Sequence, residues 1–215
     1  MNDKMLRIAI VGAGELGQQI AHLGLKNGYK VVGFFDDWST ETTVMNLPVF
    51  GKLEDVDVRN EEFDALVLGV GYKHFEFREK VFEALHTKYR FATIIDESDV
   101  IDSTATIGEG CVLYPNVTID KGVRIENNVV LNISVSIGHD SIVGAHSFVC
   151  GGALFAGRVK LGKCSFVGVH ATLSDDIEIA SNTIIGAHSL VLHGITLGGA
   201  YVGVPVRRIE PKHGL

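Results

Sequence analysis

The sequence predicts two domains of different class: an α/β domain over residues 1–96 and a parallel β-helix over residues 97–215. Three observations lead to this prediction. A buried strand near the N-terminus leads into a glycine-rich turn. An apolar residue recurs at every sixth position from Ile101 onward, and a glycine directly follows many of these apolar residues.

The N-terminal domain opens with a βαβ pattern. Residues 6–11 predict a strand, residues 18–26 a helix and residues 30–35 a second strand, with Gly-Ala-Gly-Glu-Leu-Gly at positions 12–17 between the first two. Such a turn lets backbone amides approach a phosphate, and an acid about 20 residues further on accepts a hydrogen bond from a ribose. The plainer alternative is a close-packed turn beside two solvated carboxylates. We expect nucleotide binding by Gly12, Ala13, Gly14, Asp36 and Asp37.

The rest of this domain is short. Residues 65–70 predict a third strand that leads to Gly71, which we add to the nucleotide site. Residues 75–85 predict a helix, and residues 91–95 predict a last strand before the repeat. This length leaves no room for the second half of a dinucleotide-binding sheet, so a complete NAD site is not expected.

The repeat has a period of six residues. A period of six is a multiple of the strand period of two and not of the helical 3.6, so each hexapeptide predicts a short strand and a turn. We attribute the glycines that follow many of the apolar residues to a sharply bending backbone. The apolar positions are Ile101, Ile107, Leu113, Ile119, Ile125, Leu131, Ile137, Val143, Val149, Phe155, Leu161, Val167, Leu173, Ile179, Ile185, Val191 and Leu197.

Composition narrows the function classes. The net charge of −7 argues against a nucleic-acid groove, and no apolar run is long enough for a membrane helix. The N-terminus lacks a signal-peptide layout, which favours a cytoplasmic protein. Three widely spaced cysteines predict reduced thiols and no thiolate metal site.

The glycine turn, the Asp36-Asp37 pair, the hexads and the closing Val202-Gly-Val-Pro-Val-Arg-Arg208 together resemble the NeuD/PglD-like family of sugar O- and N-acyltransferases. The resemblance covers the whole chain. It implies a left-handed β-helix, a nucleotide-linked sugar held by the N-terminal domain, acetyl-CoA along the β-helix, no metal, and a homotrimer. Asp36 and Asp37 would then face the nucleotide base.

The resemblance also assigns residues of the β-helix. The family's catalytic His and following acid fall on His139 and Asp140, and its Asn falls on Asn132. Acetyl-CoA contacts fall on Gly157, on Gly168 with Val169, and on Ala187. Two positions depart from the family: Leu16 stands where a His often reaches the sugar nucleotide, and Phe148 where some members carry a second His.

The chemistry expected at His139 is general-base catalysis. A sugar amine that attacks a thioester must lose a proton, and a neutral imidazole within reach can accept it while Asp140 holds the other ring nitrogen. Because 18 residues make one coil, Gly157 should lie about 4.8 Å above His139, a suitable place for the thioester carbonyl. Arg207, with Arg208 and Lys212, can pair with the CoA phosphates or form a solvated basic tail.

The function predicted is therefore acetyl-CoA-dependent N-acetylation of a nucleotide-linked amino sugar, of the 4-amino-4,6-dideoxy type. O-acetylation of a sugar such as a sialic acid uses the same base and stays open. A γ-carbonic-anhydrase-like zinc enzyme is a weaker alternative, because His139 and His146 are seven residues apart where that class has five. A non-catalytic or redox nucleotide-binding protein, suggested by the glycine turn, would leave the β-helix unexplained.

Overall fold

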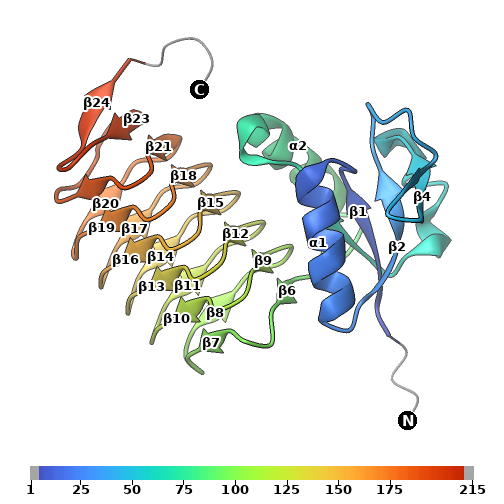
Figure 1. Ribbon diagram of the computed structural model, residues 1–215, viewed down its shortest axis with the longest axis horizontal. Helices are drawn as coiled ribbons and strands as arrows, with labels where there is room; N and C mark the ends of the chain where they lie inside the picture. The colour runs from blue at the N-terminus through green and yellow to red at the C-terminus, as the bar shows by residue number, and fades with distance from the viewer. Residues whose placement is uncertain (1–4, 211–215) are drawn as a thin grey trace. The chain divides into compact units, whose positions relative to one another are not determined.

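The computed structural model describes residues 5–210, so Lys212 lies outside the described residues. The chain divides into two compact units, residues 1–94 and residues 95–215, and each is considered by itself. The first is an α/β unit and the second a stack of short parallel strands (Figure 1).

The first unit is a five-stranded sheet in the order β3-β4-β2-β1-β5. All its strand pairs are parallel except β3 with β4. Its elements are β1 (Arg7–Val11), α1 (Glu15–Lys26), β2 (Lys30–Phe35), β3 (Thr43–Val44), β4 (Leu47–Gly51), β5 (Ala65–Leu68) and α2 (Phe75–His86), with 3₁₀ turns η1 (Leu53–Asp55), η2 (Asn60–Glu62) and η3 (Tyr72–His74).

Glycines lock the first turn against its neighbours. A Cβ on Gly17 would lie 1.9 Å from the carbonyl oxygen of Gly12, and a Cβ on Gly12 would lie 2.9 Å from that of Gly69. Gly12 also has φ +107°, a conformation that side chains rarely adopt. The turn is thus fixed by packing between β1, α1 and the end of β5.

Two predictions for this unit need correction. The β3–β4 hairpin was not predicted, because its turn uses Met45 and Asn46 at positive φ without any glycine. The last strand predicted before the repeat, at residues 91–95, is shorter than expected, because only its last two residues form a strand. Phe91 forms a single bridge to Leu66, and β6 (Ile94–Ile95) is the first strand of the β-helix sheet that contains β9.

The second unit is a parallel β-helix whose strands form three sheets. Equivalent strands in successive coils pair in register 18 residues apart, as Ile119 does with Ile137. The first sheet holds β7 (Val100–Ile101), β10 (Thr118–Ile119), β13 (Ser136–Ile137), β16 (Leu154–Phe155), β19 (Thr172–Leu173) and β22 (Leu190–Val191); the second holds β8 (Thr106–Ile107), β11 (Arg124–Ile125), β14 (Ile142–Val143), β17 (Lys160–Leu161) and β20 (Glu178–Ile179); the third holds β6, β9 (Val112–Leu113), β12 (Val130–Leu131), β15 (Phe148–Val149), β18 (Phe166–Val167), β21 (Thr183–Ile185), β23 (Gly199–Val202) and β24 (Arg207–Ile209).

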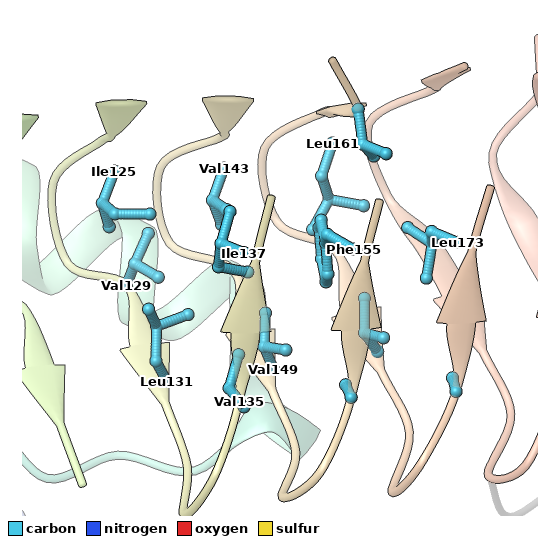
Figure 2. Close-up of a cluster of buried hydrophobic side chains, with 14 of the residues drawn as sticks. Ile125, Val129, Leu131, Val135, Ile137, Val143, Val149, Phe155, Leu161 and Leu173 are labelled. Atoms are coloured by element: carbon cyan, nitrogen blue, oxygen red, sulfur yellow. The ribbon is translucent and has the colours of Figure 1, made fainter. Parts of the chain in front are cut away.

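The predicted apolar residues fill the interior of this helix. From Leu113 to Val191 every one of them is at most 3% exposed. Figure 2 shows residues such as Ile125, Ile137 and Phe155 projecting into the space that the coils enclose. Because each strand contributes one such residue and the coils are stacked in register, the core is a continuous apolar column.

The prediction that the glycines after the apolar residues bend the backbone sharply is wrong. Gly138, Gly144, Gly162 and Gly168 do not have positive φ; a Cβ on any of them would lie within 2.4–2.7 Å of the backbone of the next coil. They permit the close approach of successive coils. The sharp bend falls two residues later, where the left-handed conformation is taken by Gly110, Asn116, Gly122, Asn128, Ser134, Asp140, His146, Gly152, Arg158, Cys164, His170, Asp176, Asn182 and His188.

The prediction that Leu197 is the inward-facing residue of the last hexad is also wrong. Leu197 is 58% exposed, whereas Ile195 is 6% exposed and bridges to Ile179, 16 residues away instead of 18. Tyr201 likewise pairs with Ile185 across 16 residues. The repeat therefore loses two residues after Val191, and the last coil closes through a shorter turn.

Candidate active site

His139 and Asp140 form a hydrogen-bonded pair at the turn after β13. The Nδ1 atom of His139 lies 2.9 Å from Oδ2 of Asp140. The two side chains are 44% and 52% exposed, so the pair is open to solvent. If Nδ1 carries the proton and donates to the carboxylate, Nε2 is left as a base, which is the arrangement the sequence predicted.

The turn geometry sets this pair in place. Asp140 has φ +57°, a conformation that Asp tolerates better than most residues, and its N–H donates to the carbonyl oxygen of Lys121 one coil below. Neighbouring glycines make room for both side chains. A Cβ on Gly122 would lie 2.6 Å from Oδ1 of Asp140, and a Cβ on Gly157 would lie 2.4 Å from Nε2 of His139.

Gly157 therefore lies beside the imidazole, one coil away as expected. Its carbonyl accepts from the N–H of Asp176, while its own N–H has no partner among the described residues. The space that a side chain would take at Gly157 is already filled by the ring of His139. Gly157 thus supports the imidazole and presents an amide donor near it.

The charge distribution favours an ionised Asp140. The hydrogen bond from His139 lowers the pKa of the Asp140 carboxyl below its ordinary value, and the charges of His139, Lys121 and Arg158 act in the same direction against a smaller desolvation effect. An ionised Asp140 can stabilise the imidazolium that forms when His139 accepts a proton. Burial raises the pKa of the Cys150 thiol to about 11, so this cysteine is not a thiolate nucleophile at neutral pH.

Of the predicted acetyl-CoA residues, Gly168, Val169 and Ala187 lie at a second corner, after the third sheet, whereas Gly157 follows β16 of the first sheet. Gly168 and Ala187 are in adjacent coils, with a Cβ on Gly168 only 2.4 Å from the nitrogen of Ala187. Val169 is 44% exposed and its carbonyl accepts from His188. Arg207 is exposed on β24, where it pairs with Val202.

One further predicted position, Asn132, belongs to this unit, as does a pair of stacked histidines. Asn132 is half-buried after β12, and its side-chain oxygen accepts from the N–H of Ile133. His170 and His188 stack with ring centroids 5.4 Å apart. Within residues 5–210 no group of three or more His, Cys, Asp or Glu side chains is arranged to hold a metal ion.

In the first unit the glycine turn and the acids come together, but the acids are already engaged. Asp36 accepts from the N–H of Ala13 through Oδ2 and from the N–H groups of Trp38 and Ser39 through Oδ1. Asp37 accepts from the N–H of Leu53. Both carboxylates thus hold the turn and the following loops, a structural role that spacing alone does not reveal.

Open space remains at two glycines of this turn region. A Cβ on Gly14 or on Gly71 would meet nothing within 4 Å. Gly14 is the N-cap of α1 and supplies no side-chain cap, so the first amides of the helix receive no hydrogen bond from it. Beside them, Gly12, Phe35, Asp36, Trp38 and Phe77 help to line a cavity of about 10 Å³, roughly the room for one water molecule.

Sequence reasoning missed the charged groups beside Asp140. Arg158 follows Asp140 by one coil, and Asp176 follows Arg158 by another. The 18-residue spacing could have identified this column, although not which atoms pair.

The chain thus combines an α/β unit that has a glycine turn with a parallel β-helix that carries an exposed His–Asp pair. Comparison with known families agrees with both units. Residues 95–212 match the model of the GMPPB C-terminal domain, and residues 7–85 match that of the PglD N-terminal domain. The chain belongs to the GMPPB C-terminal domain family, and its PglD-type N-terminal domain confirms the resemblance to the NeuD/PglD-like proteins.

Solved structures share this fold over nearly the whole chain. The acetyltransferase domain of PglB from Neisseria gonorrhoeae FA1090, in complex with acetyl coenzyme A, matches with TM-score 0.88 and 22% identity, covering 96% of this chain and 100% of that one. Perosamine N-acetyltransferase from Caulobacter crescentus, with CoA and GDP-perosamine, matches with TM-score 0.89 and 22% identity over 95% and 97%. WeeI from Acinetobacter baumannii AYE matches with TM-score 0.80 and 23% identity over 96% and 100%. The predicted left-handed β-helix fold is confirmed.

Proposed function

We propose that this protein transfers the acetyl group of acetyl-CoA to the amine of a nucleotide-linked amino sugar, of the 4-amino-4,6-dideoxy type. The observation that carries the proposal is the His139–Asp140 pair, 2.9 Å apart and open to solvent, beside the unpaired amide of Gly157. The fold neighbours support it, because they include a perosamine N-acetyltransferase bound to CoA and GDP-perosamine, solved also with a histidine replaced.

In the proposed reaction His139 is the general base. The amine nitrogen bonds to the acetyl carbon and its proton passes to Nε2 of His139. The C–S bond then breaks, and the imidazolium returns that proton to the leaving sulfur, which releases CoA as the thiol. Asp140 holds Nδ1 and stabilises the imidazolium. An amide donor near the reacting carbonyl would stabilise its developing negative charge, and the N–H of Gly157 is the candidate.

Acetyl-CoA is assigned to the corner after the third sheet. Ala187 is exposed there and carries only a methyl group, exposed Val169 offers an apolar contact, and buried Gly168 lets the two coils approach closely beneath them. Arg207 is the proposed partner of a CoA phosphate, as an always-charged, exposed donor. Asn132 is proposed to contact the sugar.

The nucleotide is assigned to the glycine turn of the first unit. The open space at Gly14 and Gly71 and the uncapped start of α1 suit a phosphate or ribose approaching the backbone. Gly12, Ala13 and Asp36 hold that turn in shape, and Asp37 accepts from the N–H of Leu53 beside it along the chain. The neighbouring cavity is too small for a base, so Trp38, which is 73% exposed and packs on Phe77, would have to move aside.

The test is acetyl-CoA turnover, followed as thiol release, with a panel of nucleotide-linked 4-amino-4,6-dideoxy sugars. We expect activity with one sugar and a loss of about 10²-fold or more in His139→Ala. His193→Ala is the matched control, because it removes an exposed β-helix histidine from the shortened turn. An unchanged rate in His139→Ala would remove His139 from the mechanism. Activity only with hydroxyl acceptors would establish O-acetylation instead.

We further propose a C3 homotrimer in the cytoplasm. Parallel coils with exposed apolar side chains such as Ile133 and Leu154 favour burial against copies of the same chain. A sedimentation mass of a single chain would refute the trimer. Among residues 5–210 no helix has the length and apolar character needed to cross a membrane.

A further inference from the structure

A column of alternating charge begins at Asp140. Asp140, Arg158 and Asp176 occupy the same turn position in three successive coils, and all three have positive φ. The N–H of Arg158 donates to the carbonyl oxygen of His139 at 2.8 Å. The backbone of Arg158 is thus hydrogen-bonded to the backbone of His139, the proposed catalytic base.

The side chain of Arg158 is turned away from Asp140 toward Asp176. Its Nε pairs with Oδ1 of Asp176, its second guanidinium nitrogen lies 2.6 Å from Oδ2, and Asp175 lies 4.0 Å away. The same groove, of about 380 Å³, is lined by Asp140, Arg158 and Asp176 together with the ion pair of Lys160 and Glu178.

Arg158 and His139 are both possible hydrogen-bond partners of the Asp140 carboxylate. A guanidinium is a stronger partner for a carboxylate than a neutral imidazole, because the bond is between two charges and can be bidentate. Arg158, one coil from Asp140 in the same groove, could displace His139 from that carboxylate. The two bonds to Asp176 hold it elsewhere.

We propose that Asp176, with Asp175 behind it, is a positioning residue that holds Arg158 away from Asp140, so that Asp140 keeps its hydrogen bond to His139. The inference rests on the proposed function, which makes His139 the base. The charged groups around the pair are Lys121, Arg158, Asp175 and Asp176. The hydrogen bond from Arg158 lowers the pKa of the Asp176 carboxyl, so Asp176 is ionised at neutral pH in the folded protein.

The test compares the wild type with D175N/D176N and with D175N/D176N/R158Q. E178Q is the matched control, because it breaks the neighbouring ion pair with Lys160 in the same groove but frees no cation stacked on Asp140. Two quantities are measured: kcat/KM for thiol release, and the tautomer of His139 read from its ring nitrogen NMR shifts. His139→Ala assigns the resonance, and melting curves verify that every variant folds.

In D175N/D176N we expect kcat/KM to fall by up to about fivefold, the effect of one exposed ion pair on an equilibrium. The Nδ1–H signature of His139 should weaken in parallel. Adding R158Q should restore both, and E178Q should change neither. A loss in D175N/D176N that R158Q does not reverse would overturn the proposal, as would an unchanged tautomer. The tautomer needs no substrate, so it tests the positioning role even if the acetyltransferase assignment fails.

Discussion

Replacing Gly157 by alanine tests whether the position of the His139 ring matters. The new Cβ would lie 2.4 Å from Nε2 of His139, so the imidazole must rotate away. Gly157 has no positive φ, and alanine is therefore tolerated by the backbone. Rotating a side chain off its favoured angle costs about 0.5–1.5 kcal/mol, and the entropy gained from removing a glycine offsets about 0.4–1 kcal/mol of that.

The free energy of unfolding of Gly157→Ala should thus stay within about 1 kcal/mol of the wild type, whereas kcat/KM should fall about 10²-fold through loss of the general base. Denaturant unfolding and thiol release measure the two quantities. Gly151→Ala is the stability control: it is one hexad earlier, and its Cβ would meet a carbonyl oxygen at 3.2 Å instead of a ring. A fully active, stable Gly157→Ala protein would refute the view that the observed His139 position is the working one.

Three further predictions concern the β-helix and the His–Asp pair. Gly162→Ala should destabilise strongly, by about 2 kcal/mol or more in urea unfolding, because its Cβ would lie 2.4 Å from the backbone nitrogen of Ser181, whereas Gly71→Ala, with open space around it, should be nearly neutral. Ser141→Ala should cost about 1–3 kcal/mol in the same assay, since the Ser141 hydroxyl accepts from the buried N–H of Val159, 3.0 Å away; a neutral result would mean that water replaces it. The pKa of the Asp140 carboxyl is lowered in the folded protein by the hydrogen bond from His139, so its stabilising contribution is present above the ordinary value near 4 and is lost as the pH falls through the lowered one. The difference in Tm between the wild type and Asp140→Asn should accordingly shrink as the pH falls below about 4, and a difference that stays constant down to the lowest pH at which both proteins fold would contradict this account.

Much of the fold was predictable because its signal is local. Each hexad residue from Leu113 to Val191 is apolar and lies inside, since a strand of two residues always turns one side chain inward. The βαβ pattern likewise indicated β1, α1 and β2 within a few residues. The hairpin of β3 and β4 was not predicted because its turn has no glycine and places Met45, an unusual residue for positive φ, before Asn46.

The class of fold, the 18-residue coil and the position of His139 beside an acid can be read from the order of residues, because each is a local pattern. The roles of the glycines and of the charged side chains follow only from the folded chain. Contacts such as Gly157 with His139, or Asp36 with the amide of Ala13, join residues far apart along the chain, and their geometry depends on stacking and loop closure. The loss of two residues after Val191 has the same origin: the coil closes where Ile195 can be buried, and a regular count of six cannot show that.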